Sequence, residues 1–472
     1  MLLPHISFAL GALSLASCAS ASGISQVSKK DTHHGDFLGV CKTIASSVSG
    51  SSQIFDPNTP QYVADNDHAF ISSSDSSACS VEPGSTEDVA VILQILGRTR
   101  TPFAIKSAGH ATNPHFSSTQ GVQVSLSRLN QLKVNAEAGT IEVGPGLTWD
   151  DVYQQLDPFN VTVIGGRIPG VGVGGLLLGG GYSFKSNQYG LGIDNIVAYE
   201  FVLPNGTIKT VTESDQDLWF ALRGGGNNFG VVTKYILKSH GQGEVWGGLA
   251  VYGPDQLEAV KNAVAKFKID LIQKLLLSLC SPTRLGSIPT LQQDVVTKSY
   301  GTFVKGLASP VIASGVRGFY CGFAATQYSS NFFDDIVNQL LHWGAQLTAL
   351  DNNVLLSAGL EPFVSSVLSH GPPSAYPPDR SHPVFPSVLS LTWSNSTLDG
   401  IMAHSIREVA DNLHAAALED GQDVKNGMIY PNYALFDTPL KDMYGDNVER
   451  LQKLRRIIDP EDVMGLAGGF KF

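Results

Sequence analysis

The stretch AIKSAGHAT, residues 104–112, decides how the rest of the sequence is interpreted. An apolar strand pattern ends there and passes into small residues, with one imidazole, His110, among them. Residues this small let a backbone approach a ligand closely. The sequence has no HExxH or Cys-x-x-Cys to make His110 a metal ligand, and no G-x-S-x-G to make it part of a triad. From these residues alone, His110 is compatible both with a general base and with an ordinary loop histidine.

Two more glycine-rich segments follow, GGRIPGVGVGGLLLGGGYS at 165–183 and DLWFALRGGGNNFGVVTKY at 217–235. The first contains G-x-G-x-x-G from residue 170, formally a dinucleotide fingerprint. We reject a Rossmann interpretation, because Pro169 precedes the first glycine and the glycines at 179–181 would break the helix that this motif opens. Three such segments instead predict a surface of free backbone N–H groups for a large, extended cofactor.

Length and charge restrict the class of protein. The chain has 472 residues, which predicts two or three domains, and 43% hydrophobic residues, enough for sizeable cores. A net charge of -11 without a basic cluster argues against a nucleic-acid partner. No segment of the expected mature chain is long and apolar enough to span a membrane.

The N-terminus predicts secretion. An apolar run from Ile6 to Leu15 is too short to span a membrane and is followed by Ala-Ser-Ala at 19–21, which fits a signal peptide over residues 1–21. In a secreted protein we expect Cys41 and Cys79 to form a disulfide. Cys280 and Cys321 remain, and the sequence is equally compatible with a disulfide between them and with two buried free thiols. Three sequons predict a glycoprotein: Asn160, Asn205 and Asn395.

The hydrophobic pattern predicts a mixed α+β protein. A helix is expected from Ser85, which begins a capping box, and another from Thr148 as N-cap. A hairpin is expected around Asn205-Gly206. After residue 246 long helical patterns alternate with apolar strands such as SVLSLTW, and the Pro-rich stretch 371–386 reads as a surface loop or lid.

Four segments occur in order: IKSAGHAT, GRIPGVGVGGLLLGGGYS, DLWFALRGGGNNFGVVT and YPNYA…YGDNVERLQKLRRIIDPEDV. Together they resemble the berberine-bridge-enzyme-like oxidases, FAD enzymes of the vanillyl-alcohol-oxidase superfamily, and most closely their secreted fungal branch. The resemblance implies an α+β fold with a two-part PCMH-type FAD-binding domain and an α+β substrate domain, whose antiparallel sheet is covered by helices. The expected divisions are a signal peptide (1–21), an N-terminal segment (22–73), the FAD-binding domain (74–245), the substrate domain (246–425) and a C-terminal segment returning to FAD (426–472).

The resemblance also implies site residues. His110 would be bonded covalently to the flavin 8α-methyl carbon. Ile168 occupies the place of a cysteine that makes a second flavin bond in many relatives, so we expect a single covalent link. Ala108 and Ala111 replace a usual glycine and a frequent serine of the family loop. The full set of expected FAD contacts is Lys106, Ser107, Ala108, Gly109, His110, Ala111, Thr112, Gly170, Gly172, Gly174, Gly175, Gly230, Val232, Asn432 and Tyr433; no metal is expected.

The function that the resemblance implies is hydride removal from a small organic substrate, with the electrons passing to O₂ to give H₂O₂. Val171 matches a position associated with oxygen access, where a small residue favours an oxidase. Tyr430 matches a tyrosine that accepts the substrate proton in some relatives, although packing on the flavin is an equal alternative. We expect a secondary-metabolite alcohol, amine or ring-closure precursor as substrate. The alternatives are oxidation of a sugar at its anomeric carbon and a secreted flavin-binding protein without significant turnover.

Overall fold

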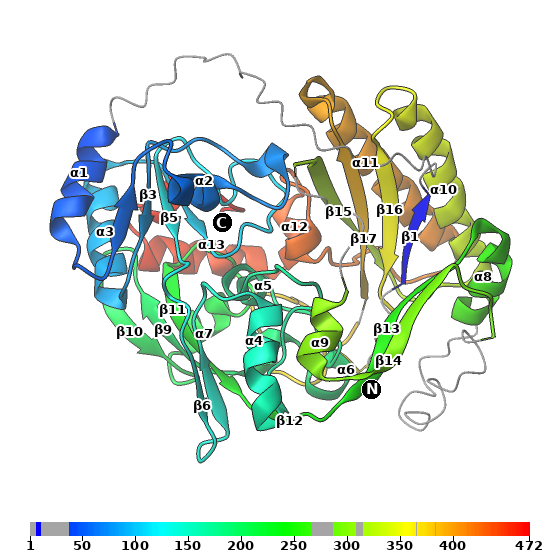
Figure 1. Ribbon diagram of the computed structural model, residues 1–472, viewed down its shortest axis with the longest axis horizontal. Helices are drawn as coiled ribbons and strands as arrows, with labels where there is room; N and C mark the ends of the chain where they lie inside the picture. The colour runs from blue at the N-terminus through cyan, green and yellow to red at the C-terminus, as the bar shows by residue number, and fades with distance from the viewer. Residues whose placement is uncertain (1–5, 11–36, 266–286, 308–314, 365, 383) are drawn as a thin grey trace.

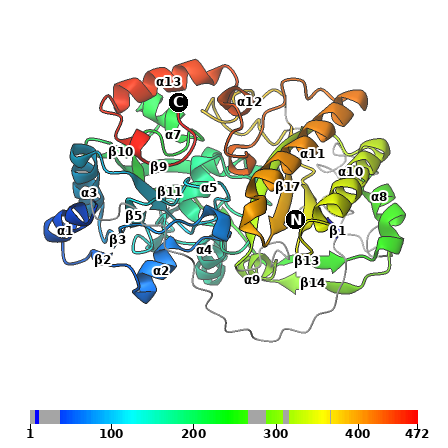
Figure 2. The same ribbon diagram turned by 90° about the horizontal axis from the view of Figure 1, so that it is seen from above.

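The computed structural model describes residues 6–10, 37–265, 287–307, 315–364, 366–382 and 384–472 (Figure 1). Two parts lie side by side, as a second view also shows (Figure 2). The first part contains residues 37–245, and the C-terminal segment folds back onto it. The second part contains β1 (Ile6–Leu10) and the elements from β13 (Val245–Val251) to α11 (Asp399–Glu419).

The first part begins with a four-stranded sheet in the order β2-β3-β5-β4. Strands β3, β5 and β4 are parallel, and β2 is antiparallel to β3. Helix α3 begins where the capping box predicts, since Ser85 Oγ accepts the Asp88 N–H at 3.1 Å. The elements are α1 (Leu38–Ser47), β2 (Gln53–Phe55), α2 (Pro60–Asn66), β3 (Cys79–Glu82), α3 (Thr86–Thr99), β4 (Phe103–Lys106) and β5 (Val122–Ser125).

A five-stranded antiparallel sheet, in the order β10-β9-β11-β7-β6, completes the first part. Helix α3 packs between the two sheets, because Val202 and Val231 of the second sheet share its hydrophobic core. The predicted hairpin at Asn205-Gly206 joins β9 to β10, with Gly206 at φ 85°. The elements are β6 (Leu132–Asn135), β7 (Thr140–Val143), α4 (Trp149–Leu156), α5 (Val173–Leu178), β9 (Ile196–Val202), β10 (Ile208–Val211), α7 (Gln216–Leu222) and β11 (Val231–Lys238).

The second part is built on an antiparallel sheet in the order β1-β16-β17-β15. Helices α10 and α11 cover one face of this sheet, and the other face is turned towards the first part (Figure 1). Alternate residues of β17 therefore face helices or the first part. The elements are β1 (Ile6–Leu10), β15 (Arg317–Ala325), α10 (Ser330–Thr348), β16 (Leu355–Leu360), β17 (Phe385–Trp393) and α11 (Asp399–Glu419). The predicted α+β class, with a helix-covered antiparallel sheet, is confirmed.

Shorter elements complete the molecule. A two-stranded ribbon pairs β13 with β14 at the outer edge of the second part. The C-terminal tail adds a parallel bridge from Ala467 to Phe103 of β4. These elements are α6 (Ser186–Tyr189), β8 (Val161–Thr162), β12 (His240–Gly241), β13 (Val245–Val251), α8 (Leu257–Ala265), β14 (Gln292–Lys298), α9 (Tyr300–Lys305), α12 (Leu440–Tyr444) and α13 (Asn447–Ile458).

The predicted disulfide between Cys41 and Cys79 is confirmed. Cys41 and Cys79 form a disulfide that fastens α1 to β3. Cys321 is a buried free thiol, and Cys280 lies outside the described residues. Most of the predicted signal peptide also lies outside them, but Ile6–Leu10 forms β1 at the edge of the second part's sheet.

The Pro-rich stretch 371–386 is a surface loop only in part: residues 372–373, 379 and 381–382 are exposed, as predicted, but residues 374–377 are buried. Ala375 and Tyr376 are buried, and Tyr376 packs beside Gly224. The buried carboxylate of Asp194 explains this placement: it receives a hydrogen bond from Arg380, at 2.8 Å, and another from Arg223, at 2.9 Å. A charge-assisted pair of this kind holds the loop inside the molecule.

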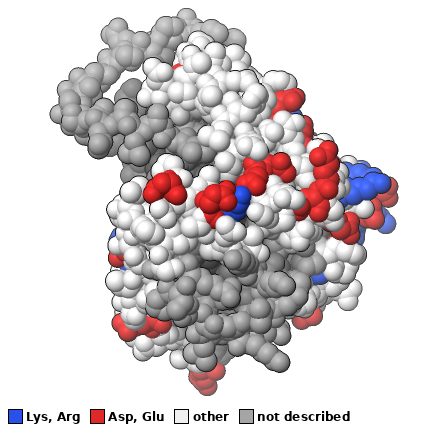
Figure 3. Space-filling view, turned by 90° about the vertical axis from the view of Figure 1, so that its right-hand side faces the viewer, with Lys and Arg blue, Asp and Glu red and all other residues white. Residues whose placement is uncertain are grey.

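The surface reflects the negative net charge. On the face shown in Figure 3, acidic side chains predominate, and the largest group of basic ones lies at one edge. No helix within the described ranges combines the length and apolarity that a membrane crossing requires.

Candidate active site

A cavity of about 360 Å³ lies between the two parts. Its walls come from the loop after β4, the glycine block around α5, the loop before β11, the open face of the second part's sheet and the C-terminal segment. The structure therefore brings together segments that are more than 300 positions apart in the sequence. Of the expected site residues, the ones that line it are Ser107, Ala108, Gly109, His110, Ala111, Thr112, Val171, Gly172, Gly174, Gly175, Gly230, Val232, Tyr430, Asn432 and Tyr433.

Two residues that were expected to contact FAD, Lys106 and Gly170, do not line the cavity. Lys106 is buried behind the loop, where its Nζ donates to Ala64 O at 2.6 Å. Gly170 is exposed, and its N–H donates to Asp150 Oδ1 at 2.8 Å. Lys106 thus supports the loop from behind, and Gly170 forms a surface turn with φ 78°.

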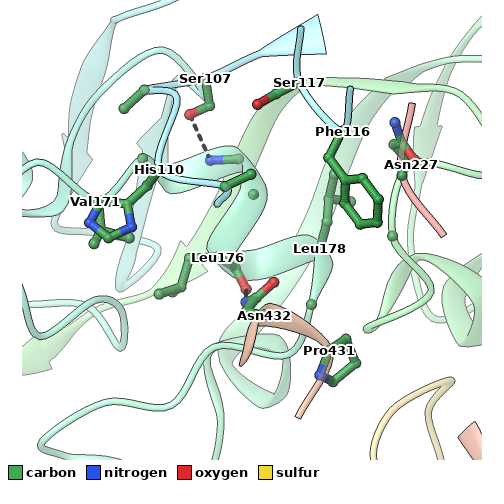
Figure 4. Close-up of a pocket in the computed structure, with 18 of the residues that line it drawn as sticks. Ser107, His110, Phe116, Ser117, Val171, Leu176, Leu178, Asn227, Pro431 and Asn432 are labelled. Carbon is green, nitrogen blue, oxygen red and sulfur yellow. Dashed lines mark hydrogen bonds between the residues drawn. The ribbon is translucent and has the colours of Figure 1, made fainter. Parts of the chain in front are cut away.

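The loop after β4 is pressed closely against the glycine block. Ser107 Oγ donates to Pro145 O at 2.5 Å and accepts the Gly174 N–H at 3.3 Å (Figure 4). A Cβ on Gly172 would meet Ser107 Oγ at 2.3 Å, so only glycine permits this approach. The residue with positive φ is Gly109, at 71°, and not Ala108. The alanine in place of the family glycine is therefore accommodated without backbone strain.

The glycine block itself forms only a short helix. α5 ends at Leu178, directly before the three glycines, as the sequence predicts. The strand that follows, β9, pairs only antiparallel within its sheet, which excludes a βαβ dinucleotide unit here. Gly175 has open space where a Cβ would stand, so its backbone faces the cavity unobstructed.

His110 has the environment of a neutral nucleophile. Its ring lies 6.3 Å from that of Tyr320, nearly parallel, and Figure 4 shows it beside the cavity near Val171. Its Nε2 is buried and has no hydrogen-bond partner within the described chain. Burial lowers the pKa of His110 to about 4, so the imidazole is uncharged at neutral pH. The residue lines the cavity, so a ligand bound there would lie against the His110 ring.

Tyr430 and Asn432 form a second polar group on the cavity. Tyr430 OH accepts hydrogen bonds from Asn432 Nδ2 at 2.8 Å and from Gly181 N–H at 3.1 Å. Asn432 Nδ2 also donates to Leu176 O at 3.2 Å (Figure 4), and because that carbonyl can only accept, the amide orientation follows. Burial raises the pKa of Tyr430, although these bonds and Arg167 oppose the shift. A raised pKa argues against a resting phenolate base.

A buried ionic cluster that the sequence did not reveal lies behind this group. Arg167 Nη1 and Glu361 Oε2 are 2.8 Å apart, with side chains only 9% and 1% exposed. Tyr433 OH accepts from Arg167 Nη2 at 2.8 Å and donates to Glu361 Oε1 at 2.7 Å. The cluster joins the glycine block, the end of β16 and the C-terminal segment. Arg167 lies next to Ile168, within a segment that the sequence analysis had already singled out. No sequence pattern around Glu361 indicated that this residue belongs to the site.

The cavity fits FAD by this chain's own features. It is lined by glycines of the block around α5 and by the ring of His110, which is uncharged at neutral pH. His110 would tether the ring system, and the backbone of 107–109 with Gly172, Gly174 and Gly175 would surround the pyrophosphate. No group of His, Cys, Asp and Glu suited to a metal ion occurs among the residues that the structure describes.

Comparisons with known proteins agree with this site. Residues 77–212 match the family model described as FAD binding domain. The chain is 33% identical over 430 residues to the FAD-dependent monooxygenase FUP4 of Fusarium proliferatum, covering 81% of this chain and 82% of that protein. It is 30% identical over 442 residues to the FAD-dependent monooxygenase tpcD of Cochliobolus heterostrophus, covering 84% of each.

Solved structures show the same fold. 6-Hydroxy-D-nicotine oxidase of Arthrobacter nicotinovorans superposes with a TM-score of 0.70 at 19% identity, covering 90% of this chain and 99% of that one. Glucooligosaccharide oxidase of Acremonium strictum, with 6-S-cysteinyl, 8α-N1-histidyl FAD, gives 0.68 at 18% identity, covering 90% and 97%. The family resemblance seen in the sequence is thus confirmed: the chain belongs to the berberine-bridge-enzyme-like FAD-linked oxidoreductases.

Proposed function

We propose that the protein is an FAD-dependent oxidase that carries its flavin on one covalent link, through His110. The observation that carries the proposal is the position of His110, whose ring lines the cavity beside the glycine block. A depressed pKa supports it, because only the neutral imidazole is a nucleophile. Ile168 lines the same cavity and has no sulfur, which supports a single link.

FAD supplies the redox chemistry, accepting a hydride from substrate carbon and passing the electrons to O₂ as H₂O₂. The protein orients the substrate and excludes water. Val171 lines the cavity and presents a small side chain, consistent with oxygen access. The curated relatives are named monooxygenases, so transfer of an oxygen atom to substrate is the competing reaction.

Proton transfer is assigned to Tyr430 as a hydrogen-bond donor rather than a resting base. Its oxygen accepts from two N–H groups, so its own proton is left for a ligand in the cavity. Those same two bonds would stabilise the phenolate if a substrate step required it. Where the substrate loses an O–H or N–H proton with the hydride, Tyr430 would have to release its own proton to solvent before it accepts the substrate's.

We further propose a secreted enzyme of fungal secondary metabolism. The relatives from Fusarium and Cochliobolus support the fungal setting, and the Cys41–Cys79 disulfide supports an oxidising compartment. Cleavage after residue 21 would remove β1 and leave β16 as the edge of its sheet. The alternatives are a sugar oxidase, the activity named for some structural relatives, and a flavin-binding protein without turnover.

The first test is acid denaturation of the protein purified from a secretory host, followed by a gel inspected for flavin fluorescence. Flavin should stay with the wild-type polypeptide and leave the His110→Ala variant. Wild-type protein that releases all of its flavin would refute the covalent link. H₂O₂ release with a substrate panel under ¹⁸O₂ then separates an oxidase from a monooxygenase, which would place label in the product. Flavin-loaded protein without peroxide or product on any donor would favour the binding-protein alternative.

A further inference from the structure

Lys185, which directly precedes α6, is a buried lysine whose ammonium group has no counter-ion among the described residues. The buried lysines of the described chain are Lys106, Lys185 and Lys261, which are 7%, 8% and 8% exposed. Lys106 Nζ donates to a backbone carbonyl at 2.6 Å, and Lys261 Nζ lies 2.8 Å from a carboxylate oxygen of Asp334 and of Glu258. Lys185 is thus the buried lysine that keeps its charge without a protein partner.

The ammonium group of Lys185 still reaches solvent. Its stem is buried, but its Nζ does not belong to the side-chain atoms that are enclosed without a hydrogen bond. Burial lowers the pKa of Lys185, and no carboxylate of the described chain opposes that shift. Nζ lies 5.7 Å from the centroid of the Tyr189 ring, a cation–π contact that leaves its three N–H donors unused. An anion arriving from solvent can therefore meet these donors.

His240 of β12 adds an open nitrogen beside the same tyrosine. The rings of His240 and Tyr189 have their centroids 3.9 Å apart. His240 Nε2 lies 2.8 Å from Asn195 Oδ1, and the Nδ2 of that amide donates to the carbonyls of Tyr189 and Leu191. These two bonds fix the amide orientation, so Nε2 of His240 carries the proton. Nδ1 has no bond within the described chain and also reaches solvent.

The charge around His240 is positive without compensation. Burial lowers the pKa of His240 to about 4, and the charges of Lys185 and Lys238 act in the same direction. Lys238 is exposed at the end of β11, where its Nζ has only a long contact, 3.5 Å, to the backbone oxygen of Asp194. The carboxylate of Asp194 is already bound by two arginines. Two uncompensated cations in a chain of net charge -11 form a local site for an anion.

We propose that Lys185, Lys238 and His240 form a binding site for the dianion of phosphate or of a phosphate monoester. Two ammonium groups match a double negative charge, and each can donate to a different oxygen. An anion beside His240 favours the charged imidazole, which takes a proton from solvent and donates from Nδ1. The site lies at α6 and β12, at the lower end of the molecule in Figure 1, and none of its residues lines the cavity between the two parts. The inference therefore does not depend on the proposed function.

Isothermal titration of inorganic phosphate into the flavin-loaded protein tests the proposal, because bound FAD occupies the glycine-lined site that could also take phosphate. Lys185→Met keeps the apolar stem and removes the ammonium group. It should weaken phosphate binding about tenfold or more, as expected for the loss of a hydrogen bond from a charged group. The matched control is Lys261→Met, at an equally buried lysine that already has two carboxylate partners. The control should leave the phosphate affinity unchanged.

Lys238→Gln gives a second measurement at an exposed position, where a folding defect is not expected, and it should also weaken phosphate. Methyl phosphate should bind as tightly as inorganic phosphate, because the site opens to solvent, whereas binding of inorganic phosphate alone would identify the free anion as the ligand. Acetate, with one charge, should bind more weakly than phosphate. The proposal is overturned if phosphate does not bind the wild type, if Lys185→Met and Lys238→Gln both bind it as tightly as the wild type, or if acetate equals phosphate.

Discussion

The buried pair of Arg167 and Glu361 offers the sharpest test of the structure. Glu361→Gln removes the carboxylate and leaves the guanidinium in a site where its side chain is 9% exposed. Burial alone would lower the pKa of Arg167, but Glu361 outweighs burial and raises it, so the guanidinium stays charged. The variant must therefore bury an uncompensated cation.

Removing one partner of a buried ion pair costs about 3–5 kcal/mol of unfolding free energy. The matched control is Asp217→Asn, which breaks the exposed pair with Arg450, whose side chains are 67% and 48% exposed. An exposed pair contributes at most about 1 kcal/mol. Urea unfolding of the flavin-loaded proteins, with flavin content measured for each, gives both free energies.

A double variant separates charge from packing. Arg167→Met with Glu361→Met removes both charges and should lose less stability than Glu361→Gln alone, since no ion is left unpaired. The reasoning fails if Glu361→Gln lies within about 1 kcal/mol of wild type. It also fails if the double variant loses as much stability as Arg167→Met and Glu361→Met, measured singly, lose in sum. Either result would mean that Arg167 and Glu361 do not stabilise each other as their 2.8 Å separation predicts.

Three further outcomes are expected. Ile168→Cys places a thiol on the cavity wall. In a double variant with His110→Ala, this thiol should hold the flavin on the polypeptide in a denaturing gel. Loss of the flavin from the double variant would contradict the position of residue 168 beside the flavin. Covalent incorporation into apoprotein should be insensitive to pH from 8 to 5, and slow as pH falls through about 4, where the His110 imidazole gains its proton; slowing near pH 6.5 would contradict the depressed pKa. Replacing Cys41 and Cys79 by serine should cost about 2–5 kcal/mol in urea unfolding, whereas Cys321→Ser, at a free thiol, leaves the disulfide intact.

Local chemistry explains what the sequence could predict. The capping box at Ser85, the hairpin at Asn205-Gly206 and the breaking of α5 by three glycines depend on neighbouring residues, and each lies where expected. The glycine segments and His110 were recognisable because close backbone approach needs small residues at fixed spacing. These patterns determined the α+β class and the cofactor-binding character of the first part.

Contacts between residues far apart in the sequence became visible only in the tertiary structure. The Arg167–Glu361–Tyr433 cluster is built from three separate parts of the chain, and nothing near Glu361 in sequence signals a partner. The Pro-rich stretch is exposed in part, as predicted, but its composition could not show that Arg380 binds the buried Asp194 or that Ala375 and Tyr376 are buried. Likewise, only strand register places Tyr320, Ser390 and Ser357 in one row across three strands at the cavity. The sequence alone therefore determined the fold class and the glycine-rich segments of the cofactor site, whereas side-chain burial and cross-strand pairing, which depend on long-range packing, decided which residues line the cavity.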